Sequence, residues 1–487
     1  MNDLWRLDAG RLIAGYRDGS FTPVQALQSC LARSEEVHSQ LNAVIATDRD
    51  GALAAARESA SRWRAGRAAS LLDGVPVAVK DNLHVRGLPT TWGSRLLAGL
   101  MPPDDELPVA RLRAAGALLF CKTNVPEFTM QGYTDNALFG ATGNPWNPAL
   151  TPGGSSGGSV ALVAAGGCPL ALCTDGGGSI RRPASHTGLV GFKPSRGRVA
   201  RAGGLPPIFL GFEVVGPVAR TVGDACTMLQ VLGGPDPRDP DSVAYRAAGS
   251  DGLPDPRTAP AQGLRILHIP RFGDHPVDPQ IAALTEAAAR GLAAMGHTVS
   301  TAQRFDAVEA VNAAWPLLAQ SGLAWLVDHP GELGAAYAAL GDARFAAQGF
   351  GPAMQASERS GRETAAPVLF GLLFELERLR GALSSLFGQF DVLLTPAAAA
   401  LPWPKAESHP PRIDGRDVGP RGHAVFTAFA NAAGLPAIVL PCGFAQGLPV
   451  GLQLVGREGD DDRLFALARQ FERAHPWPGR LPMDPAG

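Results

Sequence analysis

The sequence lacks paired cysteines, a strong net charge and a long apolar run. Its six cysteines are scattered through 487 residues and none forms a Cys-x-x-Cys pair. This excludes a zinc ribbon, a thioredoxin motif and a disulfide scaffold, so we expect buried free thiols. The formal net charge is −2, which gives the chain no general attraction for nucleic acid or for an anionic membrane.

No signal peptide or membrane span is predicted either. The first residues, MNDLWRLDAGRL, carry charges where a signal peptide needs an apolar core. The longest apolar stretch, residues 160–173, contains two glycines and a proline and is too short to cross a bilayer. We therefore expect a soluble, cytoplasmic protein that has neither a membrane nor a nucleic acid as a partner.

Lysine is also scarce, because only four of the 43 basic residues are lysines: Lys80, Lys122, Lys193 and Lys405. Arginine keeps its proton at any working pH, whereas a buried lysine can lose its proton. Lys80 ends the apolar run GVPVAVK, which predicts a strand that carries the lysine into the interior. Burial would lower the pKa of this amine, so Lys80 is a candidate general base.

Strand and helix signals alternate along the chain. They predict an α/β fold: one large domain with a central mixed, mostly parallel twisted sheet covered by helices on both faces. We expect strands in segments such as 72–83, 117–127, 169–175, 390–396 and 436–444. The expected parts of the domain (1–487) are an N-terminal helical region (1–70), a catalytic core (71–230), a variable region lining the substrate pocket (231–385) and the C-terminal part of the core (386–487).

Two glycine–serine loops are the most informative segments. They are TPGGSSGGS (151–159) and TDGGGSIRRPAS (174–185), and they flank one predicted helix and one predicted strand. Dense glycine lets backbone N–H groups approach a ligand and form the anion-binding concavity that an oxyanion hole requires. Ser179 follows three glycines, which suits a nucleophile that attacks a carbonyl. Phosphate binding is the alternative, but neither loop contains a phosphate-binding glycine motif of known mechanism.

A histidine base has little support. His186 lies seven residues after Ser179, behind Arg-Arg-Pro, and is more readily a structural residue. The pattern G-x-S-x-G at 153–157 would make Ser155 the nucleophile of an α/β-hydrolase. That motif requires a strand directly before it, and the preceding ATGNPWNPALTP is not a strand. Lys80 remains the candidate base.

Several segments together resemble the amidase signature family. They are GVPVAVKDNL, TTWGS, LFCKTNVPEF, FGATGNPWNP, GGSSGGS, TDGGGSIRRPASHTGLVGFKPSRGRV, FTAFANAAGLPAIVLPCGF and GLPVGLQLVG. The resemblance covers nearly the whole chain and is weakest from about 230 to 385. It implies the fold of that family and a reaction that needs neither a metal nor a cofactor.

The resemblance also implies roles for individual residues. Lys80, Ser155 and Ser179 match a Ser-Ser-Lys triad, in which Ser155 belongs to an unusual cis peptide and Ser179 is the nucleophile. Neutral Lys80 would take the proton of Ser179 through Ser155, and water would later release the acyl-enzyme. The implied oxyanion hole consists of Gly176, Gly177, Gly178 and Ser179. The implied acyl pocket, after KTNVPE, is lined by Thr129, Met130 and Gln131.

Supporting residues can be predicted as well. We expect Asp175 to brace the oxyanion loop through the turn N–H groups, with Arg181 as a partner for a carboxylate. Lys122 and Lys193 match motif positions of the family and are expected to be structural anchors. The aromatic residues at 315, 325, 345 and 350 are more typical of a core stripe than of a substrate wall.

The leading functional hypothesis is a hydrolase of amide bonds, or of carbamates and esters, in small molecules. The alternative within the family is the glutamine-hydrolysing component of an amidotransferase (its A chain), which releases ammonia from glutamine for a partner bound to tRNA. A third interpretation is a ligand-binding member with a dead site, against which the intact Lys80, Ser155 and Ser179 argue. The expected partners are a small amide-like substrate and, as a further hypothesis, a second copy of the chain. The sequence does not identify the substrate.

Overall fold

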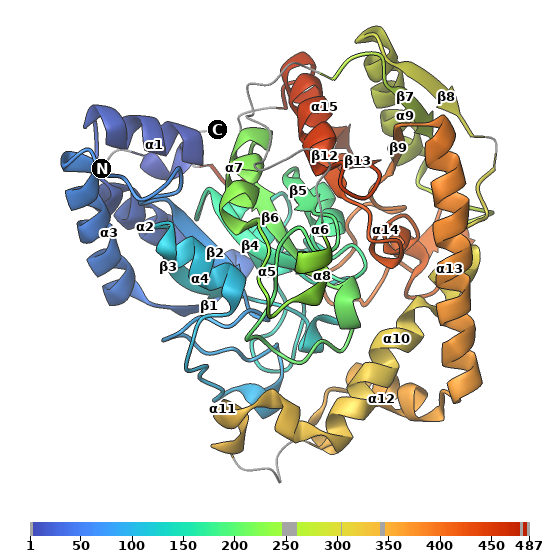
Figure 1. Cartoon of the computed structure of the whole chain (residues 1–487), viewed down its shortest axis with the longest axis horizontal. Helices are drawn as coiled ribbons and strands as arrows, with labels where there is room; N and C mark the ends of the chain where they lie inside the picture. The colour runs from blue at the N-terminus through green and yellow to red at the C-terminus, as the bar shows by residue number, and fades with distance from the viewer. Residues whose placement is uncertain (1–2, 246–260, 303, 341–345, 478–480, 485–487) are drawn as a thin grey trace.

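One large mixed sheet organises the molecule (Figure 1). The computed structural model describes residues 3–245, 261–302, 304–340, 346–477 and 481–484. Within them, eleven strands follow the order β1-β3-β2-β4-β6-β5-β12-β13-β9-β7-β8. The strands are β1 (Val44–Thr47), β2 (Pro76–Lys80), β3 (Leu118–Thr123), β4 (Leu170–Asp175), β5 (Val190–Lys193), β6 (Val214–Ala219), β7 (Arg265–His268), β8 (Thr298–Thr301), β9 (Val392–Pro396), β12 (Ala437–Ala445) and β13 (Leu448–Val455).

The sheet is mixed, as predicted, but the expectation of a mostly parallel sheet is wrong. Of the ten pairs of neighbouring strands, four are parallel and six are antiparallel. The β12–β13 pair shows the reason. Its strands are joined by Gln446 and Gly447, both with positive φ, and such a two-residue turn forces antiparallel pairing.

Helices cover both faces of the sheet, which confirms the predicted layers (Figure 1). The helices are α1 (Ala9–Asp18), α2 (Pro23–Leu41), α3 (Arg49–Arg64), α4 (Leu107–Ala114), α5 (Gly157–Ala164), α6 (Arg181–Thr187), α7 (Val222–Leu232), α8 (Pro240–Ala244), α9 (Pro279–Ala294), α10 (Glu309–Asp328), α11 (Ala335–Ala338), α12 (Pro352–Glu363), α13 (Ala366–Gln389), α14 (Ala428–Ala432) and α15 (Asp461–Ala474). Among them, no helix combines the length and the hydropathy that crossing a membrane would require.

Alternation along the central strands divides the core between the two faces. In β2, Val77 and Val79 belong to the cluster under α4, α7, α9 and α15, whereas Ala78 belongs to the cluster under α2, α3, α5 and α6. In β4, Leu172 and Cys173 divide in the same way. Successive side chains of a strand point to opposite faces, so both strands are buried on two sides. Lys80 and Asp175 are the last residues of these two parallel neighbours.

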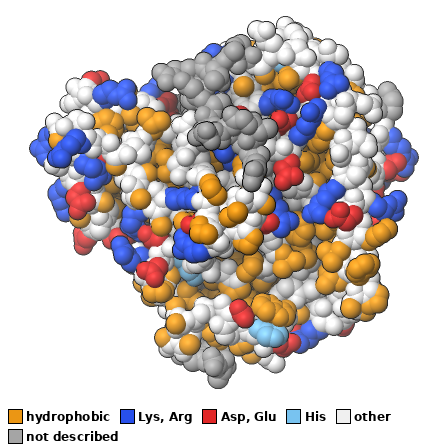
Figure 2. Space-filling view, viewed as in Figure 1, with side chains coloured by type: hydrophobic (Ala, Val, Ile, Leu, Met, Phe, Trp, Pro, Cys, Tyr) orange, Lys and Arg blue, Asp and Glu red, His pale blue; other side chains and the backbone are white. Residues whose placement is uncertain are grey.

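The variable region is divided between the sheet and a helical layer: β7 and β8 extend one edge of the sheet, whereas α10 to α13 lie outside it. Helix α13 buries a stripe of leucines, including Leu372, Leu376 and Leu379, and leaves Phe370 and Phe374 exposed. Figure 2 shows hydrophobic side chains at the surface along the edge where α13 runs. Helix α10 packs against both α12 and α13. It also reaches the loop that follows β4, where Trp315 contacts Gly176.

The cysteines follow the prediction of buried free thiols. Five of the six are buried, and Cys442 is half-buried.

Candidate active site

Lys80 is presented by the end of a fully buried strand. Its Nζ donates hydrogen bonds to Ser155 Oγ (2.8 Å), to Thr174 Oγ1 (2.8 Å) and to the Thr174 carbonyl (3.0 Å). Burial lowers the pKa of the Lys80 amine to about 8, although the negative charge of Glu213 acts in the opposite direction. A substantial fraction of the amine is therefore neutral near pH 8, as a base requires.

Ser155 lies at the start of α5, opposite Lys80. The Gly154–Ser155 peptide bond is cis. A Cβ atom on Gly154 would lie only 2.6 Å from the carbonyl oxygen of Tyr133, so the close approach of these two backbones requires glycine at this position. The structure thus brings Lys80 and Ser155 together as the resemblance implies.

Ser179 lies in the loop between β4 and α6. The neighbouring Ser156 N–H donates to the Ser179 carbonyl at 3.2 Å, which holds the two serine loops side by side. Within the described part of the chain, the Ser179 hydroxyl makes no hydrogen bond, to Ser155 or to any other group. Ser179 lines a pocket and is therefore accessible to a small ligand.

Three of the four predicted oxyanion residues have free backbone donors. In the described structure, the N–H groups of Gly176, Gly177 and Ser179 have no acceptor. The N–H of Gly178 donates to Asp175 Oδ1 at 2.6 Å and is not available to a substrate. Gly178 still shapes the loop, because its φ is 112° and a Cβ there would lie 2.2 Å from Thr427 Oγ1.

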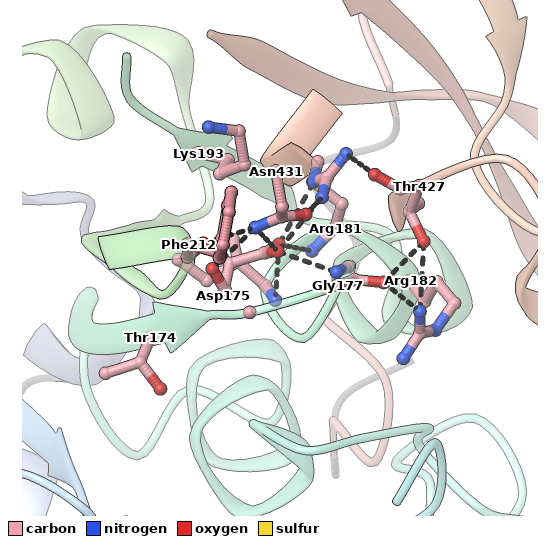
Figure 3. A network of polar contacts seen from close by, with 12 residues as sticks. Thr174, Asp175, Gly177, Arg181, Arg182, Lys193, Phe212, Thr427 and Asn431 are labelled. Carbon is pink, nitrogen blue, oxygen red and sulfur yellow. Dashed lines mark hydrogen bonds and ion pairs between the residues drawn. The ribbon is translucent and has the colours of Figure 1, made fainter. Parts of the chain in front are cut away.

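Asp175 braces this loop through turn N–H groups, as predicted, and the structure identifies Asp175 as the carboxylate that pairs with Arg181 (Figure 3). The carboxylate accepts from the N–H groups of Gly178 and Ile180 (3.0 Å), and it pairs with Arg181 Nη2 at 2.9 Å. Burial by itself raises the pKa of Asp175, but the charges of Arg181 and Lys193 hold that pKa far below its usual range. The loop therefore rests on a permanently ionised carboxylate.

The C-terminal part of the chain completes the brace (Figure 3). Asn431, on α14, donates to the Asp175 carbonyl at 2.8 Å and accepts from Arg181 Nη2 at 2.6 Å. Thr427 Oγ1 donates to the Gly177 carbonyl at 2.7 Å. Gln453 Oε1, on β13, accepts from Arg181 Nη1 at 2.7 Å. These contacts hold the carbonyl groups of Asp175 and Gly177, whereas the N–H groups of Gly176, Gly177 and Ser179 stay free.

A pocket of about 90 Å³ opens beside Ser179. The predicted acyl-pocket residues Thr129, Met130 and Gln131 all line it, and α10 and α12 contribute Trp315, Gln320 and Ser357. A larger hollow, of about 1050 Å³, lies next to α13 and contains none of the predicted site residues. We assign the small pocket to the site because it contains Ser179 and the free N–H groups.

The wall at Thr129 has an unusual backbone. Phe128 and Thr129 both have positive φ, at 52° and 57°, which is rare for a β-branched residue. Trp92 stabilises this turn, since its carbonyl accepts from the Phe128 N–H (2.8 Å) and its Nε1 donates to Thr129 Oγ1 (3.2 Å). The segment TTWGS thereby fixes one wall of the pocket.

Trp315 departs from the simple core assignment. It is buried in a hydrophobic cluster, as the periodicity predicted, yet it also lines the pocket and donates from Nε1 to the Gly176 carbonyl at 3.1 Å. Phe350 is buried, whereas Trp325 is 45% exposed. Position 345 lies outside the described residues.

Three further predicted residues, Lys122, Lys193 and His186, have the surroundings of structural residues. Lys122 pairs with buried Asp81 at 3.1 Å and donates to the Leu83 carbonyl at 2.8 Å. Lys193 donates to the Pro194 carbonyl at 2.7 Å. His186 is buried and packs edge-on against Trp403, and burial lowers the pKa of its imidazole to about 3. In the described structure, none of the three side chains contacts Ser155 or Ser179.

Sequence reasoning missed two arginines of the pocket, Arg182 and Arg421. Arg182 follows Arg181 in the motif, and its Nη1 donates to Thr427 Oγ1 at 2.9 Å and to the carbonyl of Gly177. No periodic signal separates these arginines from the many surface arginines of this chain. Among the described residues, no cluster of three or more His, Cys, Asp or Glu side chains is placed to hold a metal ion.

Comparison with known proteins agrees with this geometry. The family model described as Amidase matches residues 25–465. The chain is 34% identical to the A component of the glutamyl-tRNA(Gln) amidotransferase of Chloroflexus aggregans, over 99% of both chains. It is 37% identical to the protein of the same name from Synechococcus sp. (strain CC9605), over 94% of both chains. Among solved structures, a bacterial aryl acylamidase of the amidase signature family superposes with a TM-score of 0.87 at 28% identity, covering 97% of this chain and 96% of the other.

Proposed function

The chain belongs to the amidase family, and from this premise we propose that it hydrolyses amides through an acyl-enzyme on Ser179. The observation that carries the proposal is the contact between buried Lys80 Nζ and Ser155 Oγ, made beside a pocket that contains Ser179 and free backbone N–H groups. A lysine with a lowered pKa next to a hydroxyl is the arrangement expected of a base that activates a serine.

In the proposed reaction, neutral Lys80 accepts the proton of Ser155 as Ser155 accepts the proton of Ser179. The Ser179 oxygen attacks the amide carbonyl, and the oxyanion receives hydrogen bonds from the N–H groups of Gly176, Gly177 and Ser179. The proton then returns through Ser155 to the leaving nitrogen, and the C–N bond breaks. Water enters, loses its proton by the same route and releases the acid from Ser179.

Two candidate substrates, glutamine and a small amide hydrolysed by the chain alone, have separate support. Full-length relatives at 34% and 37% identity are named as A components of an amidotransferase, which favours glutamine more strongly than a stand-alone role. The similarity to an aryl acylamidase supports a chain that acts alone on small amides. Both interpretations use the same acyl-enzyme, so we place amide hydrolysis first and glutamine as the substrate to be tested first.

Ser179→Ala and Lys80→Ala test the proposed chemistry. Each should lower kcat by at least about 10³-fold, because each removes a group that the others need. Ser185→Ala and Lys405→Ala are matched controls, since Ser185 Oγ accepts only from the Gly451 N–H and the Lys405 side chain, in a turn, makes no hydrogen bond or ion pair in the described structure. Melting curves should show that all four variants fold. Substantial turnover in either test variant would refute the triad.

Assays of the purified chain distinguish the two candidate substrates. Ammonia release from glutamine and amine release from aryl amides are measured on the chain alone. Turnover of aryl amides without glutamine turnover supports the stand-alone hydrolase. Glutamine turnover, alone or raised by the other components of an amidotransferase, supports the amidotransferase role. Failure with every amide, ester and serine-directed phosphonate contradicts both.

A further inference from the structure

Two arginine side chains line the pocket beside Ser179 without an acidic partner. They are Arg182, on α6, and Arg421, just before the short 3-10 helix Gly422–Ala424. In the part of the chain that the structure describes, neither guanidinium forms an ion pair. All the hydrogen-bond acceptors of Arg182 are neutral: Thr427 Oγ1 and the carbonyl groups of Gly177 and Gly154.

Arg182 is the more buried of the two. It is 3% exposed, and its Nε is buried without any hydrogen-bond partner. An unpaired charge in the interior is costly, and natural structures pair such groups with a carboxylate or a bound anion. The free Nε, on a side chain that lines the pocket, leaves Arg182 able to donate to a bound anion.

The two guanidinium groups also act on each other. Burial, followed by the positive charge of Arg421, lowers the pKa of Arg182 to about 9. Burial lowers the pKa of Arg421 to about 10. Both groups still carry their charge at neutral pH, so an anion between them would relieve the repulsion and restore hydrogen bonds lost to burial.

Other arginines near the pocket have their charge neutralised by carboxylates, unlike Arg182 and Arg421. Arg181 pairs with Asp175, and Arg201 pairs with both Glu106 and Glu213. Glu213 also lines the pocket, but its carboxylate is already bound by Arg201 and by Asn82 Nδ2 (3.4 Å). The positive charge that remains uncompensated in the pocket is that of Arg182 and Arg421.

We propose that the substrate of Ser179 is an amide that carries a carboxylate, and that Arg421 and Arg182 bind this carboxylate. The inference rests on the proposed amide hydrolysis and adds the substrate class to it. Guanidinium groups match the planar carboxylate and hold it with charge-assisted hydrogen bonds. A pocket of about 90 Å³ suits a short chain, which points to the monoamide of a small dicarboxylic acid, or to an amino acid of that size with a side-chain amide.

Pairs of substrates with equal carbon-chain length test the proposal. Malonamate, succinamate and glutaramate are compared with propanamide, butanamide and pentanamide, in which a methyl group replaces the carboxylate. Ammonia release gives kcat/KM for each pair. For at least one chain length, the carboxylate should raise kcat/KM by about 10- to 100-fold, as expected for hydrogen bonds to a charged group. Equal values within all three pairs would overturn the proposal.

Arg421→Gln identifies the residue responsible. It should lower kcat/KM for the preferred carboxylate substrate by about 10- to 100-fold, mainly through KM, and leave its alkyl partner within about twofold. Arg421→Lys, which keeps the charge, should retain part of the preference. Arg378→Gln, at an exposed position on α13, is the charge-matched control and should change neither. An equal loss on both substrates would refute the carboxylate contact. Arg182 is a poor probe because it also holds the oxyanion loop.

A binding measurement keeps this inference separate from the proposed chemistry. Succinate and glutarate should raise the melting temperature of the Ser179→Ala variant, whereas butanamide and pentanamide, which carry no carboxylate, should not. The added change Arg421→Gln should abolish the effect of the dicarboxylates. If no amide is hydrolysed but this pattern holds, the carboxylate site stands and the proposed hydrolysis fails. If neutral amides are hydrolysed well and dicarboxylates have no effect, the hydrolysis stands and the carboxylate site fails.

Discussion

The protonation of Lys80 depends on a small set of contacts. Its amine is fully buried and faces hydroxyl and carbonyl oxygens, with no carboxylate in direct contact. Burial therefore dominates the pKa of Lys80. An arginine at this position would keep its proton, so the scarce lysine is the residue type that the chemistry requires.

The pH dependence of the reaction follows from this lowered pKa. Because the base must be neutral, kcat/KM should rise with pH, by about tenfold per unit well below the pKa, and level off above a pKa of about 8. The measurement is kcat/KM against pH between 6 and 10, with protein stability checked at each end. A rate that stays flat from pH 6 to 10 would contradict a titrating Lys80.

Thr174→Val should shift the pH range over which kcat/KM rises. Thr174 Oγ1 accepts from Lys80 Nζ, and an acceptor stabilises the charged amine more than the neutral one. Loss of the acceptor should lower the pKa of Lys80 and move the rising limb to lower pH. Thr123→Val, in β3 beside the strand that carries Lys80, is the control because its hydroxyl faces Ser159 Oγ. A limb that moves to higher pH, or moves equally in both variants, would contradict the assignment.

At the scale of elements, the site joins segments that are far apart in sequence. Strands β2 and β4 deliver Lys80 and Asp175, and α5 and α6 begin two residues after Ser155 and Ser179. The residue before α14, Thr427, reaches the oxyanion loop from 250 residues away. The loop is thus positioned by elements from both halves of the chain.

Thr427→Val tests this positioning. The variant keeps the side-chain shape but removes the donor to the Gly177 carbonyl, so the loop should lose part of its order. We expect kcat to fall by about tenfold with little change in KM, and the free energy of unfolding to fall by about 1–2 kcal/mol.

Thr221→Val is the matched control for that change. Thr221 accepts the Asp224 N–H at the start of α7, on the far face of the sheet from α5, and its loss should cost about 1 kcal/mol of stability. Activity at 25 °C should be unchanged in Thr221→Val. If both variants lose stability but neither loses activity, Thr427 supports the fold and not the loop geometry.

At the scale of the whole molecule, the N-terminal helices are tied to the core by buried polar contacts. Arg33 in α2 donates to the carbonyl groups of Ala165, directly after α5, and of Met483, near the C-terminus, at 2.9 and 2.7 Å. Its guanidinium also lies over the ring of Trp5 at 4.4 Å. One side chain thus joins three distant segments.

Arg33→Ala should therefore affect folding and not chemistry. The buried carbonyl of Ala165 and the partly buried carbonyl of Met483 lose their donor, which should lower the free energy of unfolding by about 2–4 kcal/mol. The kcat of the folded protein should change by less than about twofold. Arg49→Ala is the control, because its exposed pair with Glu35 contributes less than about 1 kcal/mol. Denaturant unfolding and initial rates check both variants, and an equal effect of the two would contradict the role of Arg33.

The sequence by itself determined the local structure of its motifs. Apolar runs predicted strands β2, β3 and β4, and the loops around Ser155 and Ser179 followed from glycine density, because backbone freedom is a property of the residue itself. The bracing by Asp175 was also predictable, since its partners lie within six residues.

Only the tertiary structure decided which distant groups meet. Strand direction depended on turns such as Gln446–Gly447 and on pairing between strands far apart in the chain, so the antiparallel majority was missed. Thr427, Asn431 and the pocket arginines Arg182 and Arg421 carry no periodic signal, because their roles arise when segments about 250 residues apart pack together. An unpaired arginine in the pocket differs from a surface arginine by its burial. Burial arises only when the chain folds, so the sequence alone does not reveal it.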